Sequence, residues 1–75
     1  MNKHDRKRLA ELTEQIQSLV NEIDEKGQSE QETFDNLTEG LQSSERGQQY
    51  QELAEAIESA CSDIEDALSN LTDYI

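Results

Sequence analysis

Few side chains in this 75-residue chain are suited to catalysis or metal binding. His4 is the single histidine and Cys61 the single cysteine, so the chain offers neither a catalytic triad nor a histidine–cysteine zinc site. Carboxylates are abundant, but a catalytic carboxylate needs burial or a charged neighbour to shift its pKa, and the pattern marks no such place. The group Asp63, Glu65 and Asp66 lacks the glycine turn of a calcium loop. We therefore expect no enzyme, no catalytic residue, no metal site and no cofactor.

The acidic side chains are the second candidate for a function. Asp and Glu number 18 against six Lys and Arg, which gives a net charge of −12. Proteins that grip nucleic acid through its phosphates need the opposite sign, so we expect no direct binding to nucleic acid. The acids could be a solvated surface that keeps the chain soluble, or a surface that imitates a nucleic-acid backbone and steers a basic partner toward it. This candidate acidic interaction surface consists of Glu52, Glu55, Glu58, Asp63, Glu65 and Asp66.

Length and composition allow one small domain. Hydrophobic residues are 32% of the chain, with no Trp and one Phe, which is little for a core that must stabilise a fold alone. We therefore expect help from a partner. The sequence has no run of 18 apolar residues, and no basic-then-apolar leader opens it. Together with the single cysteine, these features predict a cytoplasmic protein without membrane contact.

The elements that must position these residues are helices, because Pro is absent, Gly numbers three and strong helix formers dominate. The first apolar row has the 3, 4, 3, 4 spacing of a coiled-coil seam. It fails over residues 24–32, around Gly27, and resumes at Phe34 and Leu37. We predict a first helix over about residues 3–38 with a weak point at 24–32, where Ser29 and Glu32 could restart it as a capping box. The row consists of Leu9, Leu12, Ile16, Leu19 and Ile23.

The second helix is predicted over about residues 45–74, with two apolar rows. A turn at about residues 39–44 precedes it, with Gly40 as a left-handed C-cap and Ser43 or Ser44 as the N-cap. So short a connection makes the helices antiparallel and places the basic residues 3–8 beside the acidic end of the chain, which favours that register. The main row is Tyr50, Leu53, Ile57, Ala60, Ile64, Ala67, Leu71 and Tyr74, and the second row is Ala54, Cys61, Leu68 and Ile75.

The second row makes the apolar stripe wider than a two-helix seam needs. A hairpin alone would leave that row in water. We therefore expect an all-α antiparallel helical hairpin, a coiled coil, that dimerises into a four-helix bundle. As the apolar contact or oligomer surface we predict Tyr50, Leu53, Ala54, Cys61 and Leu68. On this stripe, Cys61 is expected to be a core thiol.

The centre of the chain, residues 32–47, resembles a group of small acidic coiled-coil proteins encoded by phages and prophages. That group shares a basic start, an FDN-L-x-E-x-LQ-x-SERG-like centre and a second helix rich in Glu-Ala-Ile steps. The resemblance implies a phage-derived, non-enzymatic, cytoplasmic protein. Its loop motif includes Phe34, Asp35, Asn36, Ser43, Ser44 and Arg46.

Three functions remain open at this point. The first is a protein-interaction module of a phage or prophage: an acidic, nucleic-acid-mimicking inhibitor of a basic host or defence protein, such as an anti-CRISPR or anti-restriction factor. The second is a structural coiled-coil assembly protein without an inhibitory role. The third is a nucleotide-binding sponge, in which the loop and the start of the second helix hold a phosphate with Ser43, Ser44 and Arg46. The expected partners are a second copy of the chain, as a homodimer, and a basic protein that can itself bind nucleic acid.

Overall fold

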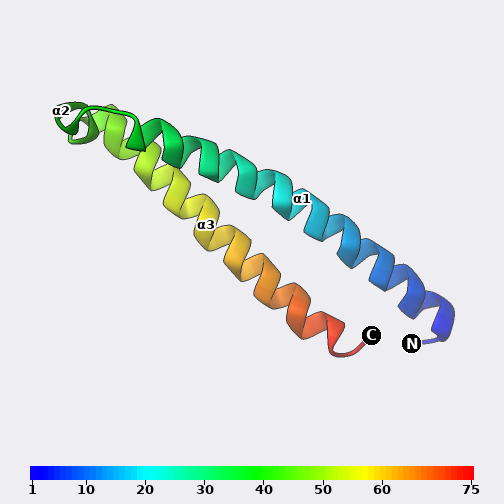
Figure 1. Ribbon diagram of the computed structural model, residues 1–75. Coiled ribbons are helices and arrows are strands. Elements are labelled where there is room, and N and C mark those ends of the chain that lie inside the picture. Colours follow the sequence, from blue (N-terminus) through cyan, green and yellow to red (C-terminus); the bar gives the residue numbers. More distant parts are fainter.

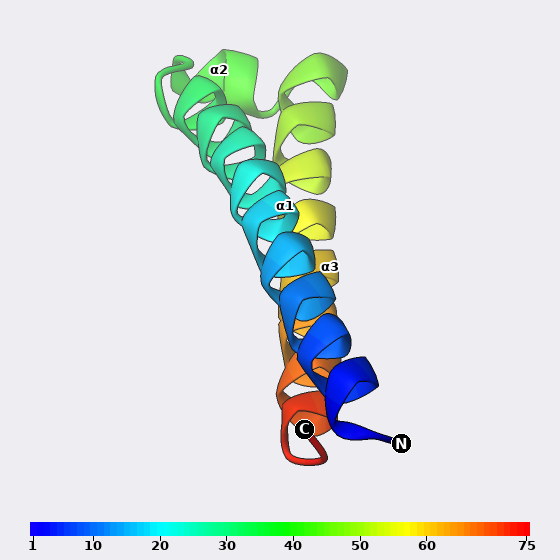
Figure 2. The ribbon, with the colours of Figure 1, turned by 90° about the vertical axis from the view of Figure 1, so that its right-hand side faces the viewer.

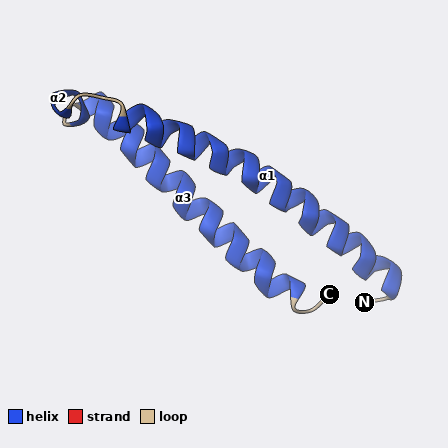
Figure 3. Ribbon diagram, viewed as in Figure 1, coloured by secondary structure: helices blue, strands red, loops and turns tan.

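Two long helices, α1 (Lys3–Asp35) and α3 (Glu45–Thr72), lie side by side and run in opposite directions (Figure 1). The short helix α2 (Glu39–Gln42) joins them at one end, and both chain termini lie at the other end (Figure 2). This computed structural model describes all 75 residues and contains only helices and connecting turns (Figure 3). The molecule is a rod of 58 × 16 × 13 Å. The predicted all-α helical hairpin is confirmed.

Side chains cap the start of both long helices. Asn2 Oδ1 accepts a hydrogen bond from the backbone N–H of Asp5 at 2.7 Å, and Ser44 Oγ accepts one from that of Gly47 at 3.1 Å. Each bond satisfies an N–H group that has no partner within its helix. Asp5 and Glu45 also place a carboxylate in each first turn, where the helix dipole favours negative charge. Of the two serines considered as the cap of the second helix, Ser44 takes that role.

The connection between the long helices differs from the prediction. α1 ends at Asp35 instead of at about residue 38, and the four-residue helix α2 occupies most of the predicted turn. Gly40 lies inside α2 and no residue has a positive φ, so Gly40 is not a left-handed cap. Instead, Gln42 Nε2 donates a hydrogen bond to the carbonyl oxygen of Phe34 at 3.1 Å, which ties α2 back to the end of α1.

α1 passes through Gly27 without a break. Gly27 is buried, and a Cβ atom added to it would lie 2.7 Å from Ile57 Cγ2, closer than real Cβ atoms come. The missing side chain therefore lets α1 approach α3 closely at this height. Ser29, considered above as the start of a new helix, lies inside α1, where its carbonyl accepts a hydrogen bond from Thr33 Oγ1 at 3.0 Å. The stretch predicted to be weak is thus a helical segment in close contact with α3.

The hairpin seam, meaning the buried residues between α1 and α3, is not the row predicted from the first helix. Ile16, Leu19 and Ile23 of that row are 42%, 58% and 42% exposed, so the prediction that they form the seam is wrong. The buried residues are small and recur every seven positions, which lets the two backbones come close. Sγ of one of them, Cys61, lies 3.8 Å from the carbonyl oxygen of Val20. The hairpin seam consists of Thr13, Val20 and Gly27 from α1 and Ala54 and Cys61 from α3.

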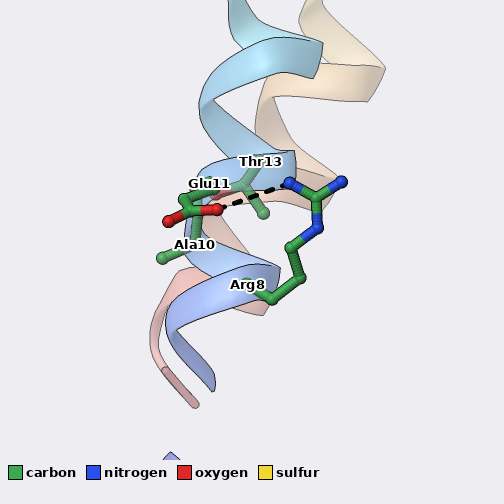
Figure 4. A network of polar contacts seen from close by, with 4 residues as sticks. All are labelled: Arg8, Ala10, Glu11 and Thr13. Atoms are coloured by element: carbon green, nitrogen blue, oxygen red, sulfur yellow. Dashed lines mark hydrogen bonds and ion pairs between the residues drawn. The ribbon is translucent and has the colours of Figure 1, made fainter. Parts of the chain in front are cut away.

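Charge pairing does not fix the register of the two helices. The structure contains one ion pair, Arg8 with Glu11 at 3.4 Å, and both residues belong to α1 (Figure 4). The predicted pairing of the basic start with the acidic end of the chain is therefore not formed. Close by, Thr13 Oγ1 donates a hydrogen bond to the carbonyl oxygen of Ala10 at 2.7 Å, which allows this hydroxyl to be buried in the hairpin seam. The register depends on packing between the helices.

Replacing Gly27 by Ala tests the close approach at the hairpin seam. The new Cβ would meet Ile57 Cγ2, and a β-branched side chain in a helix has little rotamer freedom to move away. We expect urea denaturation to show a loss of about 1–2 kcal/mol in unfolding free energy, even though Ala is the better helix former by about 1 kcal/mol. In an Ile57→Ala background the same change should stabilise the protein. An equal loss in both backgrounds would contradict the close approach.

Gly47 and Gly40 provide a second, matched pair. A Cβ at Gly47 would collide with the carbonyl oxygen of Leu41 and lie 2.8 Å from that of Gln42, whereas a Cβ at Gly40 would meet no atom within 4 Å. Gly47→Ala should therefore lower the unfolding free energy by about 1–3 kcal/mol, because backbone cannot move aside cheaply. Gly40→Ala should raise it by about 0.4–1 kcal/mol by restricting the unfolded chain. Both are measured at one protein concentration, and a stabilising Gly47→Ala would refute the packing of α2 on α3.

Candidate interaction surfaces

The hairpin has two hollows on one side of its seam, and acidic residues border both. The first, about 290 Å³, is lined by Asp24, Gly27, Gln28, Gln31, Ala54, Ile57 and Glu58. The second, about 390 Å³, is lined by Thr13, Glu14, Gln17, Glu65, Leu68, Ser69 and Thr72. Each hollow thus has one carboxylate from each long helix and no basic residue in its lining. We call this the acidic side of the hairpin, defined by Glu14, Asp24, Glu58 and Glu65.

The acidic residues predicted on the second helix are all exposed, but the structure does not gather them on one surface. Glu58 and Glu65 line the two hollows. The heptad positions of the other four place them around the outside of α3, away from α1. These four are Glu52, Glu55, Asp63 and Asp66.

Glu14 and Asp24 of α1 were not among the predicted site residues. They join Glu58 and Glu65 only because the two helices pair in this register. A heptad assignment centred on Thr13, Val20 and Gly27 would have revealed them. Leu12 and Leu19, which come one position before Thr13 and Val20 and are larger, hid that assignment in the sequence.

The opposite side of the hairpin exposes an apolar surface. On α1, Ile16 and Ile23 come just before the half-buried residues Gln17 and Asp24. On α3, Leu53, Ala60 and Ala67 come just before Ala54, Cys61 and Leu68, which also face the other helix. In an antiparallel pair, these equivalent positions of both helices lie on the same side. Leu53 is 48% exposed, and both alanines are exposed. We call this surface the apolar side, defined by Ile16, Leu19, Ile23, Leu53, Ala60 and Ala67.

The predicted apolar contact surface must be revised accordingly. Ala54 and Cys61 are buried in the hairpin seam, and Tyr50 and Leu68 are half-buried. Only Leu53 of that set is exposed. The second apolar row of α3, which was predicted to remain in water in a single hairpin, is the row that faces α1. Its small side chains allow the closer contact between the helices. The row available to a partner lies one position earlier.

The serines of the loop motif hold the connection together. Ser44 accepts the N–H of Gly47 and donates its own hydrogen to the carbonyl of Leu41. Ser43 Oγ donates to the carbonyl of Glu39 at 3.2 Å. The serine hydroxyls expected to hold a phosphate thus already bond within the turn.

The remaining loop-motif residues also have partners inside the chain. Arg46 Nε donates to the hydroxyl of Tyr50 at 3.2 Å, and its guanidinium carbon lies 5.9 Å from the centre of that ring. Asp35 Oδ1 accepts from Gln31 Nε2 at 2.9 Å, and Asn36 caps the end of α1. Half-buried Phe34 supplies the carbonyl that anchors α2, so the motif as a whole shapes the turn.

Cys61 is a core residue. Its side chain is buried in the hairpin seam. Burial raises the pKa of the Cys61 thiol above its ordinary value of 9.0, because the thiolate would lose hydration, and the carboxylates of Asp24 and Glu65 add to the effect. A raised pKa makes the thiolate scarce near neutral pH, so this cysteine is a poor nucleophile.

Comparisons of the chain with family models, curated proteins and solved structures find no match. The resemblance of residues 32–47 to phage coiled-coil proteins therefore remains a prediction. None of the three helices has the length and apolar character that crossing a membrane requires. The functional argument thus depends on the acidic side and the apolar side of the hairpin.

The Cys61 thiol predicts how stability changes at alkaline pH. The folded pKa is raised, so above about pH 9 the thiol ionises in the unfolded chain before it does in the folded chain. The free energy of unfolding should be insensitive to this group below pH 8 and fall as the pH rises beyond 9. In Cys61→Ala the fall should be smaller, as measured by urea denaturation from pH 7 to 10. An identical fall in both proteins would show that Cys61 ionises equally in the folded and unfolded states.

Proposed function

We propose that this chain is a non-enzymatic protein-interaction module that offers the acidic side of its hairpin to a basic site on another protein. The observation that carries the proposal is the pair of hollows, each bordered by two carboxylates and lined by no basic residue. Lys and Arg side chains of a partner would supply the missing counter-charge there. Because α1 and α3 hold the carboxylates on a rod, they need little ordering when the partner binds.

The charge density of the rod supports imitation of a nucleic acid. A net charge of −12 over 58 Å is about one negative charge per 5 Å of length. Duplex DNA carries one per 1.7 Å of its axis, or one per 3.4 Å for each strand. The hairpin is thus a stiff polyanion of lower density, suited to a groove that normally receives a nucleic-acid strand. Long-range attraction would also speed its encounter with such a groove.

The class of target is an extension of this proposal. We place the protein among phage or prophage inhibitors of basic host or defence proteins, such as anti-CRISPR or anti-restriction factors, acting in the cytoplasm of the host cell. The resemblance of residues 32–47 to phage coiled-coil proteins supports this class. In the same proposal, two hairpins pair into a four-helix bundle that leaves their acidic sides outward. A structural assembly role would use the apolar side alone, so the two roles differ in which side the partner needs.

Affinity capture from a host-cell lysate tests the proposal. The tagged protein is incubated with lysate at low and at high salt, and in parallel with a duplex DNA oligonucleotide as competitor. We expect a basic, nucleic-acid-binding protein that is retained at low salt, released at high salt and displaced by the DNA. Capture that survives high salt and ignores DNA, or no capture at all, would contradict imitation of nucleic acid.

A charge-matched pair of variants locates the binding surface. Glu58→Gln with Glu65→Gln removes two of the four carboxylates of the acidic side, one from each hollow, whereas Glu39→Gln with Asp73→Asn removes the same net charge at two exposed positions outside it. With the captured protein, the first variant should raise the dissociation constant at least about tenfold in titration calorimetry, and the second by less than about threefold. Equal weakening by the two variants would mean that binding depends only on total charge and that the partner does not bind at the hollows.

A further inference from the structure

We infer that the apolar side of the hairpin binds a second copy of this chain, with both loops at the same end of the resulting four-helix bundle. This inference deepens the dimer included in the proposed function by naming its surface and orientation. It rests on the surface area of the hairpin, on the sizes of the residues along the apolar side, and on the distribution of charge between the two ends of α1 and α3.

The hairpin exposes more surface than a compact chain of its mass. Its accessible area is 5822 Å² for 8.5 kDa, whereas a compact monomer of this mass exposes about 4,650 Å². The excess of about 1,200 Å² exceeds the roughly 800 Å² per partner that a stable interface buries. Within the chain only six of 75 residues are buried, and no fully buried side chain is larger than that of Val20. A second copy would supply the core that one hairpin lacks.

The apolar side alternates large and small residues in a way that fits itself. The hairpin seam places Gly27 against Ile57 and Val20 against Cys61. In that register, Ile23 of α1 lies at the height of Ala60 of α3, and Ile16 lies at the height of Ala67. α1 thus presents a ridge and α3 a shallow groove along the same length.

The fit of ridge to groove selects one orientation of the pair. When a two-fold axis runs along the rods, α1 of each copy faces α3 of the other, so Ile23 packs over Ala60 and Ile16 packs over Ala67. When the loops point in opposite directions, α1 faces α1 and the large residues oppose one another. The first orientation therefore packs better, and it buries Ile16, Leu19 and Ile23 of both copies.

Charge agrees with the chosen orientation. Residues 3–8 hold Lys3, Arg6, Lys7 and Arg8 against one acid, and the end of α3 is acidic without a basic residue. Within one hairpin these segments form no ion pair with each other. With both loops at one end, the basic start of each copy lies beside the acidic end of α3 of the other copy. The attraction between these exposed charges is modest, and it favours the same orientation as the packing does.

Solution mass provides the first test. Sedimentation equilibrium of the untagged protein should give twice the chain mass. Leu19→Gln with Ile23→Gln should raise the dimer dissociation constant by about 30- to 100-fold, because two half-exposed aliphatic side chains lose their contacts. The matched control, Ser18→Gln with Asn21→Gln, changes exposed residues of α1 on the other side and should leave the mass unchanged. A wild-type protein with single-chain mass up to high micromolar concentration would overturn the inference.

Crosslinking provides the second test and reports the orientation of the two copies directly. In a Cys61→Ala background, chains with Ile23→Cys are mixed with chains with Ala60→Cys and treated with a short bis-maleimide. We expect a crosslinked pair in this mixture and little in a mixture of Ile23→Cys with Ile16→Cys, two positions that would lie close together if α1 faced α1 with the loops at opposite ends. The reverse result would show that the loops point in opposite directions, and no crosslink in either mixture would show that the apolar side is not the interface.

The two proposals can fail separately. A monomeric wild type that still binds a basic protein in a salt-sensitive way would overturn the dimer and keep the acidic side. A dimer with the expected crosslink that captures no basic protein would keep the dimer and overturn the acidic side as a binding surface. The capture experiment, on the tagged protein, and the mass measurement, on the untagged protein, are therefore both made on the wild-type sequence.

Discussion

The close contact of small residues along the hairpin seam determines the rest of this structure. At Gly27 there is no side chain between the backbone of α1 and Ile57, and further along the seam Cys61 reaches the carbonyl oxygen of Val20. Dispersion forces act over short distances, so a seam of small residues packs densely, although each contributes little area. No ion pair joins α1 to α3. The register of the hairpin, and with it the placement of the charges and of the larger apolar residues, therefore depends on this close packing.

The first consequence is the division of the hairpin into two unlike sides. Turning Val20 and Gly27 toward α3 moves Ile16, Leu19 and Ile23 away from it, on the same side as Leu53. The same rotation brings Glu14 and Asp24 to the hollows that Glu58 and Glu65 border. One side therefore carries unpaired carboxylates, and the other carries apolar side chains in water. The acidic side lacks cations to pair with its carboxylates, and the apolar side lacks a second apolar surface to cover it. A single assembly can supply both.

The loop holds the two long helices at the spacing that the seam needs. Ser44 caps α3, Gln42 bonds to the end of α1, and Gly47 leaves room for the carbonyl groups of α2. The polar groups of the central motif are thus used within the turn, and Arg46 is held by Tyr50. The motif is best understood as a device for a tight connection between helices, while the long sides of the rod remain available to partners.

The sequence by itself determined the helical content, the hairpin, the approximate location of the connection, a serine cap at residue 43 or 44 and the excess of negative charge. These follow from local preferences and from composition, which need no knowledge of the other helix. It did not determine which row of residues forms the seam, because both Ile16–Leu19–Ile23 and Thr13–Val20–Gly27 have heptad spacing and the larger residues promise more buried area. Only the tertiary structure decided between them, since the closeness of two helices depends on the smallest residues that face each other. That choice of row also fixed which carboxylates share a side and which apolar residues remain exposed.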